Sequence, residues 1–232
     1  MLLSHCIWRV ATAQFLLGSS PKKTLTMSAA EKINSFLFGC GTDNTGEFDH
    51  EAGILGLSQE NASIVFQTAQ KYNKIFSYCL PPSASSTGHL TFGSQTPAPA
   101  NIIYTKLVAQ KSPSYGLDLT GIGLGGCISC SDVGTYPRIT GPSADIDTCY
   151  DFSKNTRVTV PVISFFFKDG TVVGMPEKSS LITYNSTLSC LGFSEYDEDD
   201  DESIIGNLVQ RTMEVVYDVA GQRIGFAPNG CT

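Results

Sequence analysis

The chain contains 232 residues, of which 41% are hydrophobic and 16% are charged, and its formal net charge is −7 at pH 7. The negative charge argues against binding to nucleic acid or to an anionic membrane surface. No apolar run approaches the roughly 20 residues that a membrane-spanning helix needs. Glycine and proline are frequent while strong helix signals are few, so we expect a mainly β protein without a membrane span.

The beginning of the chain carries few clear signals. Residues 1–20 show no regular period and are expected to be irregular. They also make a poor signal peptide, because the segment lacks a basic start and Arg9 interrupts the apolar run. Alternating and apolar stretches predict strands at residues 24–27 and 35–40, and Asp43-Asn44-Thr45-Gly46 has the composition of a turn.

The middle of the chain combines one helix with several short strands. Residues 53–57 form a glycine-flanked apolar run, which we interpret as a buried strand. Ser63 is expected to cap a helix over residues 63–72. The proline-rich residues 96–100 are the best linker candidate, so we place a lobe boundary there. Further strands are predicted at residues 76–80, 89–93, 102–104, 115–126, 147–152, 158–165, 180–183 and 188–193.

The last thirty residues hold the clearest pattern. Met213, Val215 and Tyr217 alternate with Glu214, Val216 and Asp218, and a turn at residues 220–222 leads into residues 223–226. This pattern predicts a β-hairpin. Ahead of it, Ile204-Ile205-Gly206 matches the run at residues 53–57 and suggests a second buried strand that another backbone crosses closely.

These motifs together resemble the pepsin-like aspartic proteases, peptidase family A1. The run at residues 204–207, the Tyr-Asp-x-Ala-Gly hairpin at residues 217–221 and Gly-Phe-Ala-Pro at residues 225–228 resemble the end of that family. The final Asn-Gly-Cys and Phe38-Gly39-Cys40-Gly41 resemble its nepenthesin-like plant branch. The resemblance implies a bilobed pepsin-like acid-protease fold with an incomplete N-terminal lobe and a shortened C-terminal lobe. Its expected parts are an irregular segment at 1–20, a partial N-terminal lobe at 21–97 and a C-terminal lobe at 98–232.

Catalysis in such a family requires two Asp-Thr/Ser-Gly motifs. Their carboxylates lie about 3 Å apart and share one proton, so that the pair activates a water and protonates the substrate. The segment from Met1 to Cys40 contains no aspartate, so the first motif is absent from this chain. The second is represented at best by Asp132-Val133-Gly134-Thr135, where Val133 replaces the hydroxyl residue. A rival alignment deletes the whole catalytic loop. Asp132 is therefore the catalytic candidate, and it lacks a partner.

Other chemistry-bearing residues favour structural roles. His5, His50 and His89 are isolated, and the Cys127-Ile128-Ser129-Cys130 pair has no second pair or histidine at metal-binding spacing. Seven acids stand in the eight positions 195–202, which indicates a solvated loop; calcium or a basic partner is the alternative. We expect no metal site and no cofactor.

The cysteines and sequons indicate a secretory compartment. The chain has eight cysteines, and asparagines at 61 and 185 stand in Asn-x-Ser/Thr sequons. The family resemblance implies the bridges Cys149–Cys190 and Cys79–Cys231 and leaves Cys40 without its usual partner. A secreted protein is expected, although the N-terminus is no convincing signal peptide.

Three hypotheses about function remain open. The chain is an aspartic endopeptidase relative that is inactive as it stands, with a polypeptide substrate if it is active. Alternatively, it is a non-catalytic protein-binding or inhibitor-like module, with the loop at residues 81–88 or the acidic run as its recognition surface. A third hypothesis has two copies each contributing Asp132, but the chain's own second lobe would obstruct that dyad, so we expect a monomer.

Overall fold

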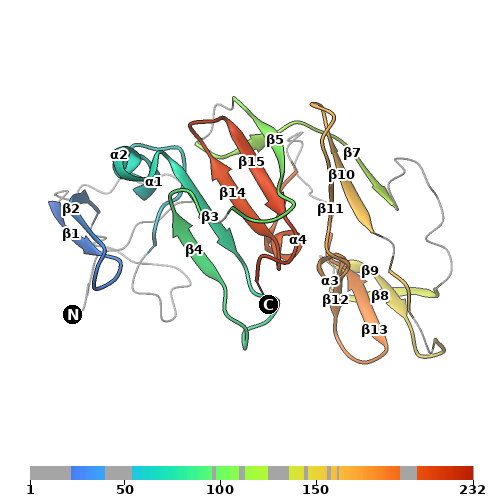
Figure 1. The fold of residues 1–232 in the computed structure, drawn as a ribbon. Helices are drawn as coiled ribbons and strands as arrows, with labels where there is room; N and C mark the ends of the chain where they lie inside the picture. Colours follow the sequence, from blue (N-terminus) through green and yellow to red (C-terminus); the bar gives the residue numbers. More distant parts are fainter. Residues whose placement is uncertain are drawn as a thin grey trace. The chain divides into compact units, whose positions relative to one another are not determined.

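The computed structural model describes residues 22–39, 54–95, 98–109, 113–124, 136–143, 146–155, 158–160, 162–193 and 203–231. The fold is mainly β, as predicted, with strands joined by short helices (Figure 1). The chain divides into two compact units. The first comprises residues 1–75 and 109–116, and the second comprises residues 76–108 and 117–232. The lobe boundaries expected from the sequence stay a prediction. None of the described helices is long and apolar enough to cross a membrane.

In the described part of the first unit there are one hairpin and two short helices. β1 (Lys22–Thr26) pairs antiparallel with β2 (Lys32–Leu37). α1 (Ile64–Gln67) and α2 (Ala69–Tyr72) follow each other directly. The side chain of Gln67 accepts a hydrogen bond from the Leu37 amide at 2.7 Å and donates to the Leu37 carbonyl at 2.9 Å. These two hydrogen bonds hold α1 against the end of the β1–β2 hairpin.

The predicted helix over residues 63–72 is interrupted. Ser63 caps α1 as expected, since its hydroxyl accepts a hydrogen bond from the Phe66 amide at 3.3 Å. Thr68, however, donates its hydroxyl to the Ile64 carbonyl at 2.6 Å and has a φ of −108°. Threonine hydroxyls that bond back to a preceding carbonyl compete with the helical pattern, so the helix breaks at Thr68.

The second unit is built around a six-stranded sheet with the order β4-β3-β14-β15-β5-β6. Figure 1 shows its central hairpin, β14 and β15, in red beside β3. The predicted C-terminal hairpin is therefore confirmed. The strands are β3 (Ile75–Cys79), β4 (His89–Phe92), β5 (Ile103–Val108), β6 (Gly116–Leu117), β14 (Glu214–Asp218) and β15 (Arg223–Ala227).

Two smaller sheets complete the second unit. The first has the order β11-β10-β7, and the second has the order β12-β13-β9-β8. Their strands are β7 (Leu119–Leu124), β8 (Arg138–Ser143), β9 (Ile146–Asp151), β10 (Ile163–Phe167), β11 (Val172–Gly174), β12 (Leu181–Thr183) and β13 (Leu188–Leu191). The short helices α3 (Glu177–Ser180) and α4 (Asn207–Gln210) precede β12 and β14. The strand expected from residue 158 begins only at Ile163.

The core of the second unit is made by strands that bury both faces. Val215 is 1% exposed and Val216 is 7% exposed, although successive residues of a strand point to opposite sides. Phe226 of β15 stacks on Phe167 of β10, with 6.4 Å between the ring centroids. The six-stranded sheet is therefore covered on both sides near its centre, and any polar side chain there needs a partner.

Candidate functional site

The only catalytic candidate from the sequence, Asp132, lies outside the described residues. So do the cysteines at 127 and 130 and the acidic run at residues 195–202. The structure therefore does not test them. Within the part of the chain that it describes, no group of three His, Cys, Asp or Glu side chains could hold a metal ion.

The two segments expected to support catalytic loops are not strands. Residues 54–57 and 203–206 have no regular secondary structure. Ile54 is 42% exposed, Leu55 is 39% exposed and Ile204 is 80% exposed, so the prediction of buried strands at both places was wrong. A buried strand needs neighbours for its backbone hydrogen bonds and its apolar side chains. Among the described residues, no strand pairs with either segment.

The second of these segments is nevertheless tethered to the six-stranded sheet. The Gln210 side chain donates to the Ile205 carbonyl at 2.6 Å and accepts a hydrogen bond from the Tyr78 hydroxyl. The hydroxyls of Tyr78 and Tyr217 are 3.1 Å apart, and burial raises the pKa of Tyr78. Tyr217 also stacks on Phe76, with ring centroids 4.5 Å apart. A tyrosine cluster thus fixes α4 against β3 and β14.

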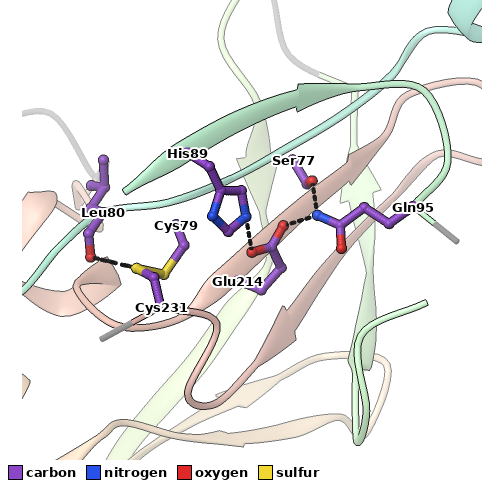
Figure 2. A network of polar contacts seen from close by, with 7 residues as sticks. All are labelled: Ser77, Cys79, Leu80, His89, Gln95, Glu214 and Cys231. Carbon is purple, nitrogen blue, oxygen red and sulfur yellow. Dashed lines mark hydrogen bonds and ion pairs between the residues drawn. A yellow bond between two sulfur atoms is a disulfide. The ribbon is translucent and has the colours of Figure 1, made fainter. Parts of the chain in front are cut away.

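A second polar network surrounds a buried carboxylate, Glu214, at the start of β14. Glu214 is 2% exposed. One of its oxygens lies 2.8 Å from His89 Nε2, and the other accepts a hydrogen bond from the side chain of Gln95. Gln95 also donates to the Ser77 hydroxyl at 2.7 Å. Figure 2 shows Glu214 between His89 and Gln95, with Ser77 beyond the amide.

This network borders a cavity of about 400 Å³. Polar side chains of the wall include His89, Gln95 and Glu214 and two asparagines, Asn101 and Asn229. These asparagines belong to the segments at residues 99–101 and 227–230, which form the rest of the wall. A serine, a histidine and a carboxylate occur together here, which invites comparison with a nucleophilic triad. The geometry excludes that role, because the Ser77 hydroxyl contacts the amide of Gln95 and not the imidazole. Ser77 is also only 1% exposed. The arrangement satisfies a buried charge and leaves no activated nucleophile.

The C-terminal end of the chain is fastened beside this network. The bridge Cys79–Cys231 joins the end of β3 to the penultimate residue, as Figure 2 shows, and Cys149–Cys190 joins β9 to β13. Both pairings implied by the family resemblance are confirmed. Cys40, expected to be left over, lies outside the described residues. All four cysteines in the described part of the chain are therefore bridged.

Sequence reasoning missed the role of Glu214. In the sequence, Glu214 is only one member of the alternation that predicts a hairpin. The overlooked signal is its neighbourhood, because Met213, Val215 and Val216 are all apolar and indicate a strand buried on both faces. A glutamate in such a strand requires buried partners, and His89 and Gln95 come from a separate part of the chain.

The sequence and the architecture resemble those of known proteins. A family model described as xylanase inhibitor N-terminal matches residues 4–94, and one described as xylanase inhibitor C-terminal matches residues 130–228. An aspartyl protease family protein of Arabidopsis thaliana is 36% identical in an alignment that includes 99% of this chain. The chain belongs to the pepsin-like aspartyl protease family.

Further similarities agree with this family. Aspartyl protease AED1 of Arabidopsis thaliana is 35% identical over 98% of this chain. The chain spans about half the length of the curated relatives it matches, 56% and 57% for these two proteins. Among solved structures, conglutin gamma from lupine seeds superposes with a TM-score of 0.71 and covers 86% of this chain and 63% of its own, at 18% identity. The aspartic proteinase from Irpex lacteus has a TM-score of 0.65 at 15% identity and covers 98% of this chain and 88% of its own. Both show the fold.

Proposed function

We propose that this 232-residue chain is a catalytically inactive member of the aspartyl protease family. The observation that carries the proposal is in the sequence: no Asp-Thr-Gly or Asp-Ser-Gly tripeptide occurs anywhere in it, and the first aspartate is Asp43. Two carboxylates that share a proton are needed to activate water at acid pH, and one carboxylate cannot reproduce that coupled titration.

Two further observations support the proposal. The segments at residues 54–57 and 203–206, which family members use beside their catalytic loops, are irregular here, and Ile54, Leu55 and Ile204 are exposed. The alignment with the first Arabidopsis relative extends over 268 residues while it includes 99% of a 232-residue chain. That relative therefore has residues inside the aligned region that this chain lacks, and a shortened loop around Asp132 would account for some of them.

Proteolysis of an acid-denatured globin at about pH 4, where pepsin-like pairs are active, tests this proposal. The full chain is assayed with and without pepstatin, next to Asp132→Asn, and the longer Arabidopsis relative serves as the positive control. We expect cleavage by the relative and none by either form of the chain. Pepstatin-sensitive cleavage that disappears in Asp132→Asn would show that the chain is an active protease and that its substrates are polypeptides.

A second candidate function is the binding of a secreted glycosidase. The family models that match the chain are described as the two parts of a xylanase inhibitor, which favours this alternative. The loop between β3 and β4 offers a recognition surface, since Ser83 and Ser85 are exposed and their hydroxyls lie 3.0 Å apart. A biosensor assay with purified microbial xylanases should then detect binding that Ser85→Arg abolishes. No binding to any xylanase at about 10 μM, a weak but measurable affinity, would remove this candidate.

We also propose that the protein is a secreted, monomeric glycoprotein. Its described disulfides and its two sequons support an oxidising, glycosylating compartment. Fractionation of plant cells that express the chain, together with size-exclusion chromatography of the recovered protein, tests the compartment and the monomer separately. Recovery from the cytosol, or a dimer at all concentrations, would contradict the respective part.

A further inference from the structure

The tip of the β12–β13 hairpin carries the sequon Asn185-Ser186-Thr187. Tyr184 is 44% exposed, and Asn185 and Ser186 are also exposed. β12 is the outermost strand of its four-stranded sheet. The asparagine is therefore presented at the solvent-facing end of a sheet edge, where a bulky group meets no described element.

The hairpin tip is organised around the side chain of Asn185. Its carboxamide oxygen accepts three hydrogen bonds, from the Thr187 amide at 2.9 Å, the Thr187 hydroxyl at 3.1 Å and the Leu188 amide at 2.8 Å. The threonine hydroxyl is thereby held against the carboxamide of the asparagine. The side-chain nitrogen of Asn185 makes no hydrogen bond within the described part of the chain, so it remains available.

The other sequon, Asn61-Ala62-Ser63, has a different geometry. Ser63 is 3% exposed, and its hydroxyl caps α1 by accepting from the Phe66 amide at 3.3 Å. The hydroxyl of this sequon is thus committed to a helix start and does not contact the carboxamide of Asn61. Both arrangements are local, since each involves residues at most three positions apart. The bonds around Asn185 need only the hairpin tip and can form before the rest of the chain has folded, whereas the Ser63 cap forms together with the four-residue helix α1.

We propose that Asn185 is the N-glycosylated asparagine of this chain and that Asn61 is left unmodified. The inference rests on the proposed secretion. The donor would be an oligosaccharide linked to a lipid pyrophosphate. The bond from Asn185 Nδ2 to the anomeric carbon forms while the bond from that carbon to the pyrophosphate oxygen breaks. The pyrophosphate leaves with the electron pair, and the amide nitrogen loses one proton.

A glycan at this position also has a physical consequence for the sheet. No described strand pairs with the outer edge of β12, and an unpaired strand edge is a template for pairing with another chain. A hydrated glycan at the end of this strand obstructs such an approach and covers Tyr184. The modification would therefore suppress edge-to-edge association of secreted copies.

The test uses two variants that keep the local hydrogen bonds. Asn185→Asp retains a carboxylate oxygen that accepts from Thr187 and Leu188 but cannot be glycosylated, and Asn61→Asp is the matched control. The full chain and both variants are expressed in plant cells behind a cleavable secretion leader. Peptide-N-glycosidase treatment in heavy-oxygen water, followed by peptide mass spectrometry, then marks each asparagine that carried a glycan.

We expect one glycan, removed by Asn185→Asp and kept in Asn61→Asp, with the heavy-oxygen label on residue 185. Secreted protein that carries no glycan, that is modified at Asn61 alone, or that is modified equally at both positions would overturn the inference. The same chain without the leader tests secretion itself. Protein that stays in the cytosol there while the leader-directed chain is glycosylated at Asn185 would refute the proposed compartment and leave the site assignment standing.

Discussion

Removal of His89 probes how the fold accommodates a charge inside its largest sheet. Glu214 is 2% exposed. In His89→Ala, its carboxylate loses the contact with His89 and keeps the hydrogen bond from Gln95. A hydrogen bond to a charged group contributes about 1.5–3 kcal/mol to stability. The His89 side chain is 40% exposed, so water replaces part of the lost interaction. We therefore expect a coupling free energy between His89 and Glu214 of about 1.5 kcal/mol, at the lower end of that range.

A double-mutant cycle measures this coupling. The free energies of unfolding of His89→Ala, Glu214→Ala and the double variant are obtained from urea titrations, with Glu214→Ala alone expected to cost about 3 kcal/mol because it also leaves a cavity. The exposed pair Glu31–Lys71 supplies the matched control cycle, and its coupling should be several-fold smaller. A His89–Glu214 coupling no larger than that of the exposed pair would refute the reasoning.

Three further predictions concern stability. The bridge Cys79–Cys231 closes a loop with a sequence separation of 152, so replacing both cysteines by alanine should lower the free energy of unfolding by up to about 5 kcal/mol in a chain-entropy model, measured by urea titration. Asp169 has a pKa of about 2. Desolvation raises this pKa, but the hydrogen bonds from Thr171 and two other residues lower it by a larger amount. Its stabilising effect is thus present above the ordinary pKa of 3.8 and is lost as the pH falls toward 2, so Asp169→Asn should be less stable than wild type at pH 5, and the difference should disappear by about pH 2. Gly221→Ala would drive a Cβ atom into the carboxylate of the hairpin residue Asp218, and thermal unfolding should show a loss of about 1–2 kcal/mol.

Local signals account for the parts of the fold that the sequence predicted well. The alternation from Met213 to Asp218 and the turn after it specify a hairpin, and they do so within about fifteen residues. The hydroxyl of Ser63 caps α1 in the same local way. The bridges were predicted from family resemblance, because spacing alone leaves the pairing of eight cysteines open.

The features that were missed have both long-range and local causes. Glu214 is 125 positions from His89 and 119 from Gln95, so no local sequence pattern predicts their hydrogen bonds. The late start of β10 has a local cause, since a proline at position 161 cannot donate a ladder hydrogen bond. The break at Thr68 follows from a hydroxyl that can bond either to solvent or to the preceding turn, and the hydrophobic pattern does not decide between them.

At residues 54–57 and 203–206 the sequence matches the family motif, but neither segment is a strand. A strand is stable only while neighbouring strands pair with its backbone and other residues cover its apolar side chains. With Ile54 at 42% and Ile204 at 80% exposure, that cover is absent among the described residues. Within the described part of the chain, the motif is thus present in the sequence without forming a strand. The structure retains the hairpin of β14 and β15, which local signals specify, the Glu214 network, which joins distant parts of the chain, and the two covalent bridges. These features do not require a catalytic dyad, which explains how the fold can be kept in a chain that lacks the first catalytic motif.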